Sequence, residues 1–312
     1  MSADPGLLAR RLASFRTWQR TADAADEPGP AGRRDPFASR SRSLELAERL
    51  ASTLDGELIA TSDGAFVRCE GRAAPLPVDR RRLATLPGQP HETAPLLCLD
   101  TETTGLGTAT GTYVFLVGLG WWEADRFRQI QLLLPDQSEE RAFLAALAAQ
   151  VPRNAWLVTY NGRGFDWPLL VTRYRMDRSA VPSHAGHLDL LPLVRRLFRH
   201  RIGDARLRTV ETSLLGVRRV ADVEGPEIPG RYLSFLRDGS ADLLADVVRH
   251  NAQDVRSLAV LLAHLAERYG DRRRWPEAPP GDLAGLARAF RREERLTDAL
   301  DCLDAALGGA EA

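Results

Sequence analysis

The 312-residue sequence contains no lysine, so all 42 of its basic side chains are arginine. They are balanced by 42 acidic side chains, which gives a formal net charge of zero. This balance argues against a strongly basic, non-specific nucleic-acid binder, although it does not exclude a local basic patch. Cysteine is also scarce. The three thiols, Cys69, Cys98 and Cys302, are too few and odd in number for a disulfide scaffold.

Long apolar runs are missing as well. No segment approaches the roughly 20 apolar residues that are needed to span a bilayer, and the first residues contain no hydrophobic signal region. Hydrophobic residues make up 44% of the chain and charged residues 27%, a composition typical of globular proteins. We therefore expect a protein without a membrane partner, in a reducing, cytoplasmic setting.

Changes in composition divide the chain into four predicted regions. Residues 1–42 are rich in Ala, Gly, Pro, Ser and charge, which predicts a disordered lead-in. Residues 43–94 predict a helix, two short strands around a Ser-Asp-Gly turn, and a linker rich in Pro and Arg. Residues 95–270 begin with strand-like runs, continue with alternating strands and helices, and end in helices, which predicts an α/β domain with a mixed sheet. Residues 281–308 predict a helical hairpin.

Two acidic residues stand at the end of the first strand of the α/β domain, in the segment LLCLDTETTGL. Side chains alternate along a strand, so Asp100 and Glu102 project from the same face. Two ionised carboxylates in a buried place repel one another, and a hard divalent cation relieves that repulsion. A solvated strand end would explain the same pattern.

Two later segments carry further ionisable residues. In TYNGRGFDWPLL, Asp166 follows a Gly-x-Gly turn at the start of a helix, where it is either a site residue or a helix N-cap. In HNAQDVRSL, His250 and Asp254 lie four residues apart and share one helix face. Taken alone, such a pair is more typical of the margin of an apolar stripe than of a site.

In combination, the order DxE, then Asn…FD, then HxxxD resembles the DEDD (DnaQ-type) exonucleases of the ribonuclease H-like superfamily, and especially the YprB-like group. The matching segments are LDTETTGL, GTYVFLVGLG, YNGRGFDWPLL and HNAQDVRSL, within about residues 95–268. The resemblance implies a ribonuclease H-like mixed β-sheet flanked by helices. It also implies a metal-dependent phosphodiester hydrolase, most simply a 3′→5′ exonuclease on single-stranded DNA or RNA.

The same resemblance implies a role for each acidic motif. Asp100, Glu102, Asp166 and Asp254 would hold two divalent ions, Mg²⁺ or Mn²⁺, which stabilise both the attacking and the leaving oxygen. His250 stands in the place of the general base. The sequence departs from the pattern here, because related enzymes have a Tyr four residues before the last Asp or a His five before it.

Residues near these motifs are candidates for substrate binding. By resemblance, Thr103, Gly105 and Leu106, together with Thr104, would hold the terminal nucleotide, since Gly105 lets a backbone approach closely. Asn161 is predicted either to contact the substrate or to brace its loop.

Three further candidates have plain structural alternatives. Asp189 either supports the metal ligands from behind or caps the helix that follows it. Arg195 and Arg199 belong to an arginine-rich stretch that suits phosphate oxygens, but a solvated helix face is an equal explanation.

The C-terminal hairpin resembles one tetratricopeptide repeat, with small and large apolar residues at the packing positions of that motif. A lone repeat cannot bury its own face, so we expect it to pack on the nuclease domain, or to bind a protein partner or a second copy. Two other functions remain open for the whole chain. One is a non-catalytic nucleic-acid-binding or scaffold protein on the same fold, and the other is a structure-specific endonuclease.

Overall fold

The computed structural model describes residues 36–105, 111–220 and 222–308. Most of the lead-in predicted for residues 1–42 lies outside these ranges. The first helix, α2 (Pro36–Leu54), begins before the segment 44–54 in which the sequence predicts it. Its Leu46, Ala47 and Leu50 are buried in the core. By internal contacts, the chain from Arg42 onward forms one compact unit.

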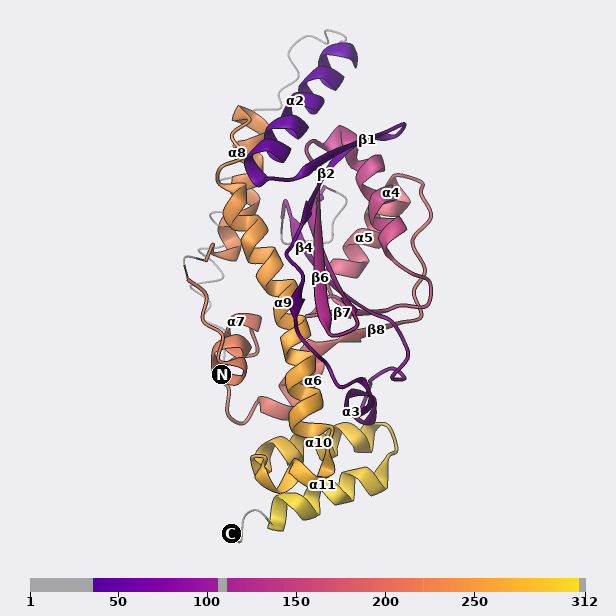
Figure 1. The fold of residues 1–312 in the computed structure, drawn as a ribbon, viewed down its shortest axis with the longest axis vertical. Helices are drawn as coiled ribbons and strands as arrows, with labels where there is room; N and C mark the ends of the chain where they lie inside the picture. The colour runs from indigo at the N-terminus through magenta and orange to yellow at the C-terminus, as the bar shows by residue number, and fades with distance from the viewer. Residues whose placement is uncertain (1–35, 106–110, 221, 309–312) are drawn as a thin grey trace. The chain divides into compact units, whose positions relative to one another are not determined.

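The eight strands in the described ranges form a single mixed sheet (Figure 1). Five consecutive neighbours are antiparallel, in the order β1 (Glu57–Thr61), β2 (Gly64–Glu70), β6 (Arg126–Leu133), β5 (Val114–Glu123) and β4 (Leu96–Thr103). Beyond β4, the strands β7 (Trp156–Thr159) and β8 (Gly186–Asp189) continue the sheet in parallel, and the two-residue β3 (Ala74–Pro75) pairs with β6. The predicted mixed α/β sheet is therefore confirmed.

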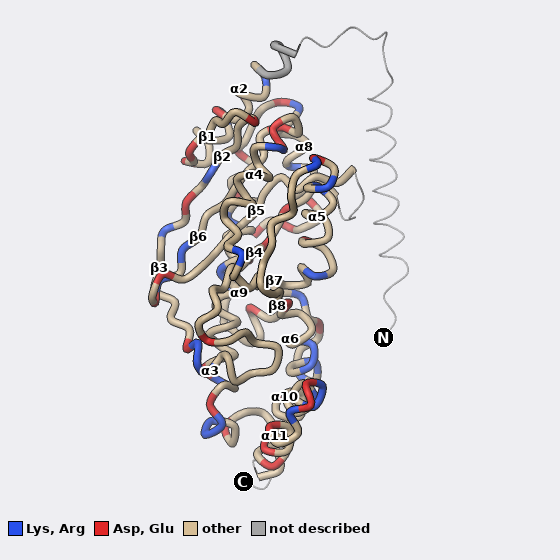
Figure 2. Tube along the Cα trace, turned by 90° about the vertical axis from the view of Figure 1, so that its right-hand side faces the viewer, with Lys and Arg blue, Asp and Glu red and all other residues tan. Residues whose placement is uncertain are grey.

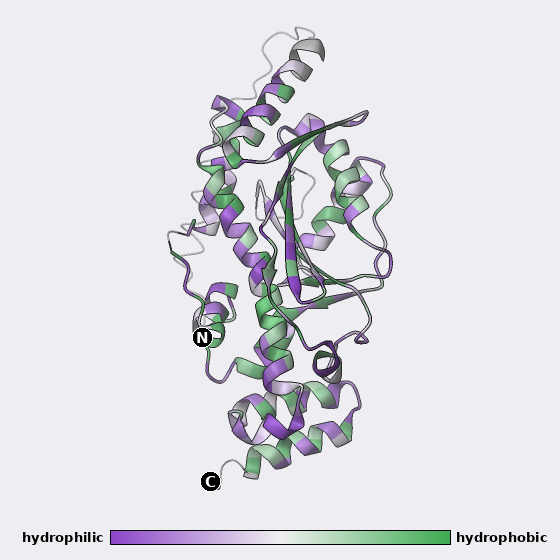
Figure 3. Cartoon of the chain, viewed as in Figure 1, coloured by the Kyte–Doolittle hydropathy of each residue, from purple (hydrophilic) through white to green (hydrophobic). Residues whose placement is uncertain are grey.

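Helices cover both faces of this sheet (Figure 1). The helices α4 (Glu140–Gln150) and α5 (Asp166–Met176) lie on one face, and the long helix α9 (Leu244–Tyr269) crosses the other. Figure 3 shows that α9 is polar where it passes the middle of the sheet and apolar further along. This polar stretch contains the HNAQD segment.

Most of the remaining described helices follow β8 in the chain. They are α6 (Leu190–Phe198), α7 (Leu207–Val210), α8 (Ile228–Asp238), α10 (Pro280–Arg292) and α11 (Leu296–Gly308), with a π-turn at Glu211–Leu215 and short 3₁₀ turns at Gln137–Glu139, Gly225–Glu227 and Arg272–Glu277. The predicted helices at the C-terminus are present, and α10 packs against both α11 and α6. Within the described ranges, no helix is both long enough and apolar enough to cross a membrane.

Besides the two-residue β3, the helix α3 and the strand β8 are not predicted from the sequence. The helix α3 (Arg80–Thr85) lies within the Pro- and Arg-rich connector, where Asp79 caps it by accepting a hydrogen bond from the backbone N–H of Arg82. The strand β8 is four residues long and runs directly into α6. The hairpin β1–β2 also joins the main sheet through β6, so the segment 43–94 continues the sheet of the α/β domain.

Candidate active site

The acidic residues of β4 face helix α9, as strand alternation predicts. The side-chain amide of Asn251 donates to a carboxylate oxygen of Asp100 over 2.8 Å. Asn251 is itself fully buried and accepts a hydrogen bond of 3.0 Å from Gln131 on β6. The orientation of the Asp100 carboxylate is therefore set by a chain of two amides that begins on a neighbouring strand.

Asp166 reaches the end of the same strand from the other face of the sheet. It is the first residue of α5, whose N-cap is Phe165, so Asp166 does not have the capping role that its position in the sequence suggests. Its carboxylate is 6% exposed and accepts a 2.5 Å hydrogen bond from the hydroxyl of Thr101. Thr101 stands between Asp100 and Glu102, so the three acids surround one short stretch of β4.

The electrostatics show that these carboxylates act on one another. Burial raises the pKa of Asp100 well above its ordinary value, and the charges of Asp254, Asp166 and Glu102 raise it further. Burial also raises the pKa of Glu102, again with contributions from Asp254 and Asp166. Burial raises the pKa of Asp166 to about 6, although the hydrogen bond from Thr101 opposes this. Since like charges shift a pKa only at short range, the four acids form one cluster.

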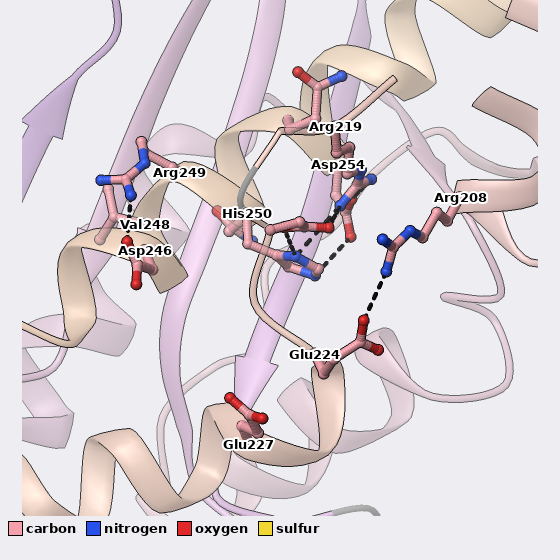
Figure 4. A network of polar contacts seen from close by, with 12 residues as sticks. Arg208, Arg219, Glu224, Glu227, Asp246, Val248, Arg249, His250 and Asp254 are labelled. Atoms are coloured by element: carbon pink, nitrogen blue, oxygen red, sulfur yellow. Dashed lines mark hydrogen bonds and ion pairs between the residues drawn. The ribbon is translucent and has the colours of Figure 1, made fainter. Parts of the chain in front are cut away.

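The last acid, Asp254, lies on α9 beside His250 and an arginine (Figure 4). The Nε2 atom of His250 is 3.6 Å from a carboxylate oxygen of Asp254. The guanidinium of Arg219 donates to Asp254 and, through two bonds of 2.6 and 2.7 Å, to the fully buried Glu211. Burial raises the pKa of Asp254, while the charges of Arg219 and His250 oppose this.

Four residues of the site were not predicted from the sequence: Glu211, Arg219, Asp222 and Asn251. Asn251 lies inside the HNAQD segment, and its place directly after His250 was the available signal in the sequence. Arg219 and Asp222 lie on the segment between the π-turn and α8. Nothing in the sequence distinguishes Arg219 from the many other arginines of a lysine-free chain.

The cluster suits a divalent cation in charge and in ligand type. Carboxylate oxygens are the ligands that Mg²⁺ prefers in proteins, and a cation would offset the repulsion that raises the pKa values of Asp100 and Glu102. In the described part of the chain, no group of three His, Cys, Asp or Glu side chains is already placed to hold a metal ion. Asp254 pairs with Arg219 instead, and Asp166 with Thr101.

The predicted substrate-binding residues after β4 lie next to the carboxylates in the chain. The hydroxyl of Thr103 donates to the carbonyl of Gly105 over 2.6 Å, and that of Thr104 accepts from the backbone N–H of Tyr113 at 2.9 Å. These bonds fix the backbone that follows Glu102. Leu106 lies outside the described residues.

Asp189 and Asn161 brace the turn that leads to Asp166. Asn161 has a left-handed backbone (φ 70°), and its N–H donates to Asp189 over 2.8 Å. The Asp189 carboxylate also accepts from the N–H groups of Arg163 at 3.2 Å and Leu191 at 3.1 Å. Asp189 therefore caps α6, which is one of the two roles that the sequence suggests for it. Its carboxylate also links the end of β8 to the turn at Asn161.

The predicted phosphate-binding arginines do not pair with the acidic cluster. Arg195 is in the last turn of α6 and Arg199 is its C-cap, and both side chains are exposed. Among the described residues, neither forms a hydrogen bond or ion pair with the four carboxylates. The arginines of α6 appear as blue segments near α10 in Figure 2.

The position of α9 depends on a glycine of β5. Gly118 is the strand partner of Asp100, and a Cβ at this position would overlap the side chains of Asn251 and Val255. We expect Gly118→Ala to push α9 away from the sheet and to lower the free energy of unfolding by about 1–3 kcal/mol, as overpacking does. Chemical denaturation measures this. Gly111→Ala, where a Cβ would meet nothing within 4 Å, is the control. Equal stability of both variants would contradict the packing described.

Several known proteins resemble this chain in sequence or in structure. The chain is 39% identical over 186 residues to the uncharacterized protein YprB of Bacillus subtilis (strain 168), an alignment that covers 59% of this chain and 45% of YprB. The chain thus spans less than half the length of that relative. Similar solved structures include a family B DNA polymerase from the hyperthermophilic archaeon Pyrobaculum calidifontis (TM-score 0.42, 16% identity, 65% of this chain and 29% of that chain). Another is exonuclease I (TM-score 0.35, 13% identity, 60% of this chain and 46% of that chain).

A sequence model of the RNase H superfamily matches residues 97–266. This range covers more than half of the chain and contains the four clustered acids together with His250. The protein therefore belongs to the RNase H superfamily.

Proposed function

We propose that this protein is a metal-dependent nuclease, and more narrowly a DEDD-type 3′→5′ exonuclease that acts on single-stranded DNA or RNA. The observation that carries the proposal is the convergence of Asp100, Glu102, Asp166 and Asp254 from β4, α5 and α9, with His250 beside the last acid. A binding-only protein would gain nothing from four carboxylates that raise one another's pKa. Membership of the RNase H superfamily supports the same chemistry.

In this proposal the acids hold two divalent ions, Mg²⁺ or Mn²⁺. When bound, such ions stabilise the charge on the attacking and leaving oxygens of an in-line displacement. Asn251 orients Asp100, and Thr101 orients Asp166. His250 accepts the proton of the attacking water, a task suited to an imidazole.

The substrate would enter along the backbone that follows Glu102. Thr103, Gly105 and Leu106 would contact the terminal nucleotide, and Asn161 would support it from the turn before α5. Arg195 and Arg199 would meet the phosphate backbone further along. Since the net charge of the chain is zero, we expect weak binding that depends strongly on salt.

A panel of labelled substrates tests this function. DNA and RNA oligonucleotides, labelled at either end, are incubated with Mg²⁺ or Mn²⁺, next to a circular single strand. We expect shortening from the 3′ end, no cleavage of the circle, and no reaction in EDTA. Cleavage of the circle would identify an endonuclease instead. Metal-independent binding without turnover would support the rival function, a non-catalytic nucleic-acid-binding protein.

Metal binding also predicts a change in thermal stability. Asp166 has a raised pKa of about 6 in the folded chain. Its protonated side chain therefore contributes favourably to the free energy of unfolding at low pH, and this contribution is lost as the pH rises through 6. A bound cation offsets the resulting repulsion, so millimolar Mn²⁺ should raise the Tm more at about pH 8 than at about pH 5. At a concentration 100 times the Kd, the stabilisation is about 2.7 kcal/mol.

Thermal melts at the two pH values measure this shift. Asp246→Asn is the control, because Asp246 lies on α9 but pairs with Arg231 and Arg249 on the surface. It should keep the Mn²⁺-dependent shift. A wild-type Tm that does not respond to Mn²⁺ at about pH 8 would contradict a metal site in the acidic cluster.

A further inference from the structure

A second carboxylate contacts His250, from a segment that none of the sequence motifs includes. Asp222 lies between the π-turn and α8, and its side chain is only 7% exposed. One of its carboxylate oxygens is 2.7 Å from Nδ1 of His250. The other oxygen accepts a hydrogen bond of 3.1 Å from Arg219. Figure 4 shows His250 beside Arg219 and Asp254.

This contact determines which ring nitrogen carries the hydrogen. An ionised carboxylate can only accept hydrogen bonds, so the 2.7 Å contact requires a hydrogen on Nδ1. Burial would raise the pKa of Asp222, but the hydrogen bond and charge of His250, with the charge of Arg219, hold it below its ordinary value. Asp222 is therefore ionised at neutral pH. In the neutral form of the imidazole, the lone pair is then on Nε2, which lies on the side of Asp254.

Arg219 cannot replace Asp222 as the acceptor of the hydrogen on Nδ1 of His250. Its guanidinium is 3.3 Å from Nδ1 of His250, but arginine has only donors and cannot accept the hydrogen on Nδ1. It is already held by two bonds to the buried Glu211 and by its pair with Asp254. Arg219 therefore does not depend on Asp222 for its counter-charge. Among the described residues, Asp222 is the carboxylate that contacts Nδ1 of the imidazole.

We infer that Asp222 is a positioning residue for His250: it fixes the ring with Nδ1–H bonded to the carboxylate and Nε2 free toward the acidic cluster. This inference rests on the proposed nuclease function. During hydrolysis, the oxygen of the attacking water bonds to phosphorus, the P–O bond to the leaving oxygen breaks, and the proton of the water passes to Nε2 while Nδ1 keeps its own hydrogen. The leaving oxygen takes up a proton, and Nε2 gives its proton back to that oxygen or to solvent. The Asp222 carboxylate stays ionised and stabilises the resulting imidazolium through the same hydrogen bond.

The variant Asp222→Asn tests the inference with little change in shape. The amide of Asn can donate to Nδ1, which turns the ring to the tautomer with the hydrogen on Nε2 and removes the proton acceptor. We expect kcat to fall by about 10- to 100-fold, as for other residues that orient a catalytic group. We expect KM and the Mn²⁺-dependent shift in Tm to be retained, and Asp222→Glu to restore part of kcat.

The matched control is Glu224→Gln. Glu224 lies two residues further along the same segment, but it is exposed and pairs with Arg208 at 2.8 Å (Figure 4). The kcat of Glu224→Gln should equal that of the wild type. If Asp222→Asn loses the metal-dependent shift in Tm together with kcat, Asp222 has a general structural role and the inference is wrong.

A spectroscopic measurement is independent of turnover. In protein labelled with ¹⁵N-histidine, the signals of His250 are identified by their loss in His250→Gln. The wild type should show the Nδ1–H tautomer, and Asp222→Asn should move it toward Nε2–H. If the tautomer or kcat is unchanged in Asp222→Asn while the wild type cleaves oligonucleotides, only the inference is overturned. If the wild type cleaves nothing, the nuclease function fails, and the tautomer still reports whether Asp222 holds His250.

Discussion

Replacing Asp100 by Asn is expected to reduce the rate of oligonucleotide hydrolysis more than any other single change in the site. Asp100 is the acid whose pKa responds to all three other carboxylates, so it lies centrally among the residues that would hold the metal ions. Loss of such a ligand removes several kcal/mol of transition-state stabilisation, which corresponds to roughly a 10³- to 10⁴-fold lower rate. Single-turnover kinetics with excess enzyme measure this loss directly.

The variant separates a loss of chemistry from a loss of fold. Asn can still accept the hydrogen bond that Asn251 donates to position 100. The substitution also removes a buried charge that repels Asp254, Asp166 and Glu102. In the absence of metal, we therefore expect the Tm of Asp100→Asn to be at least as high as that of the wild type, while its Mn²⁺-dependent shift is lost.

The exposed Asp125, in the turn between β5 and β6, is the control for this experiment. Asp125→Asn should keep full activity. If Asp100→Asn degrades substrate as fast as the wild type, the observed activity belongs to a contaminant and the proposed nuclease function is wrong.

The strand and helix motifs were readable from sequence because their geometry is local. Strand alternation places Asp100 and Glu102 on one face, and a spacing of four residues on a helix brings His250 beside Asp254. The 3.6 Å separation of Nε2 and the carboxylate oxygen shows that the unusual spacing of this histidine still brings it to the last acid. The mixed sheet was predictable from the order of strand-like and helical segments along the chain.

The rest of the site depends on tertiary placement, which no local pattern encodes. Arg219 and Asp222 approach α9 only because their segment folds back between the π-turn and α8, and neither shows any periodicity. Asn251 gains its role from Gly118, whose missing side chain lets α9 lie against β5. The short strand β8 was missed because four residues that run directly into a helix give too little alternation to detect.

The largest effect on stability is expected where the C-terminal hairpin meets α6. Asp282, at the start of α10, is completely buried. Its carboxylate accepts two bonds of 2.9 Å from Arg201 and one of 2.6 Å from the hydroxyl of the buried Tyr269. A Cβ at Gly285 would overlap the backbone of Arg196, so α10 lies directly on α6. These contacts make α10 part of the same packed unit as α6, while four leucines of α11 stay exposed: Leu296, Leu300, Leu303 and Leu307.

Asp282→Ala leaves the Tyr269 hydroxyl and the Arg201 guanidinium without their shared partner. Breaking a buried ion pair costs about 3–5 kcal/mol, and because the Arg201 side chain is 33% exposed and can turn to water, we expect a value near the lower end. Urea unfolding measures the loss. The control is Asp301→Ala on α11. The side chain of Asp301 is 39% exposed and pairs with Arg272 at the surface, and such pairs contribute at most about 1 kcal/mol to the free energy of unfolding. Equal losses in the two variants would show that the hairpin is not anchored through Asp282. Asp189 caps α6 and also braces the turn before Asp166. We therefore expect a loosened hairpin to reduce activity first at temperatures where α6 itself begins to unfold.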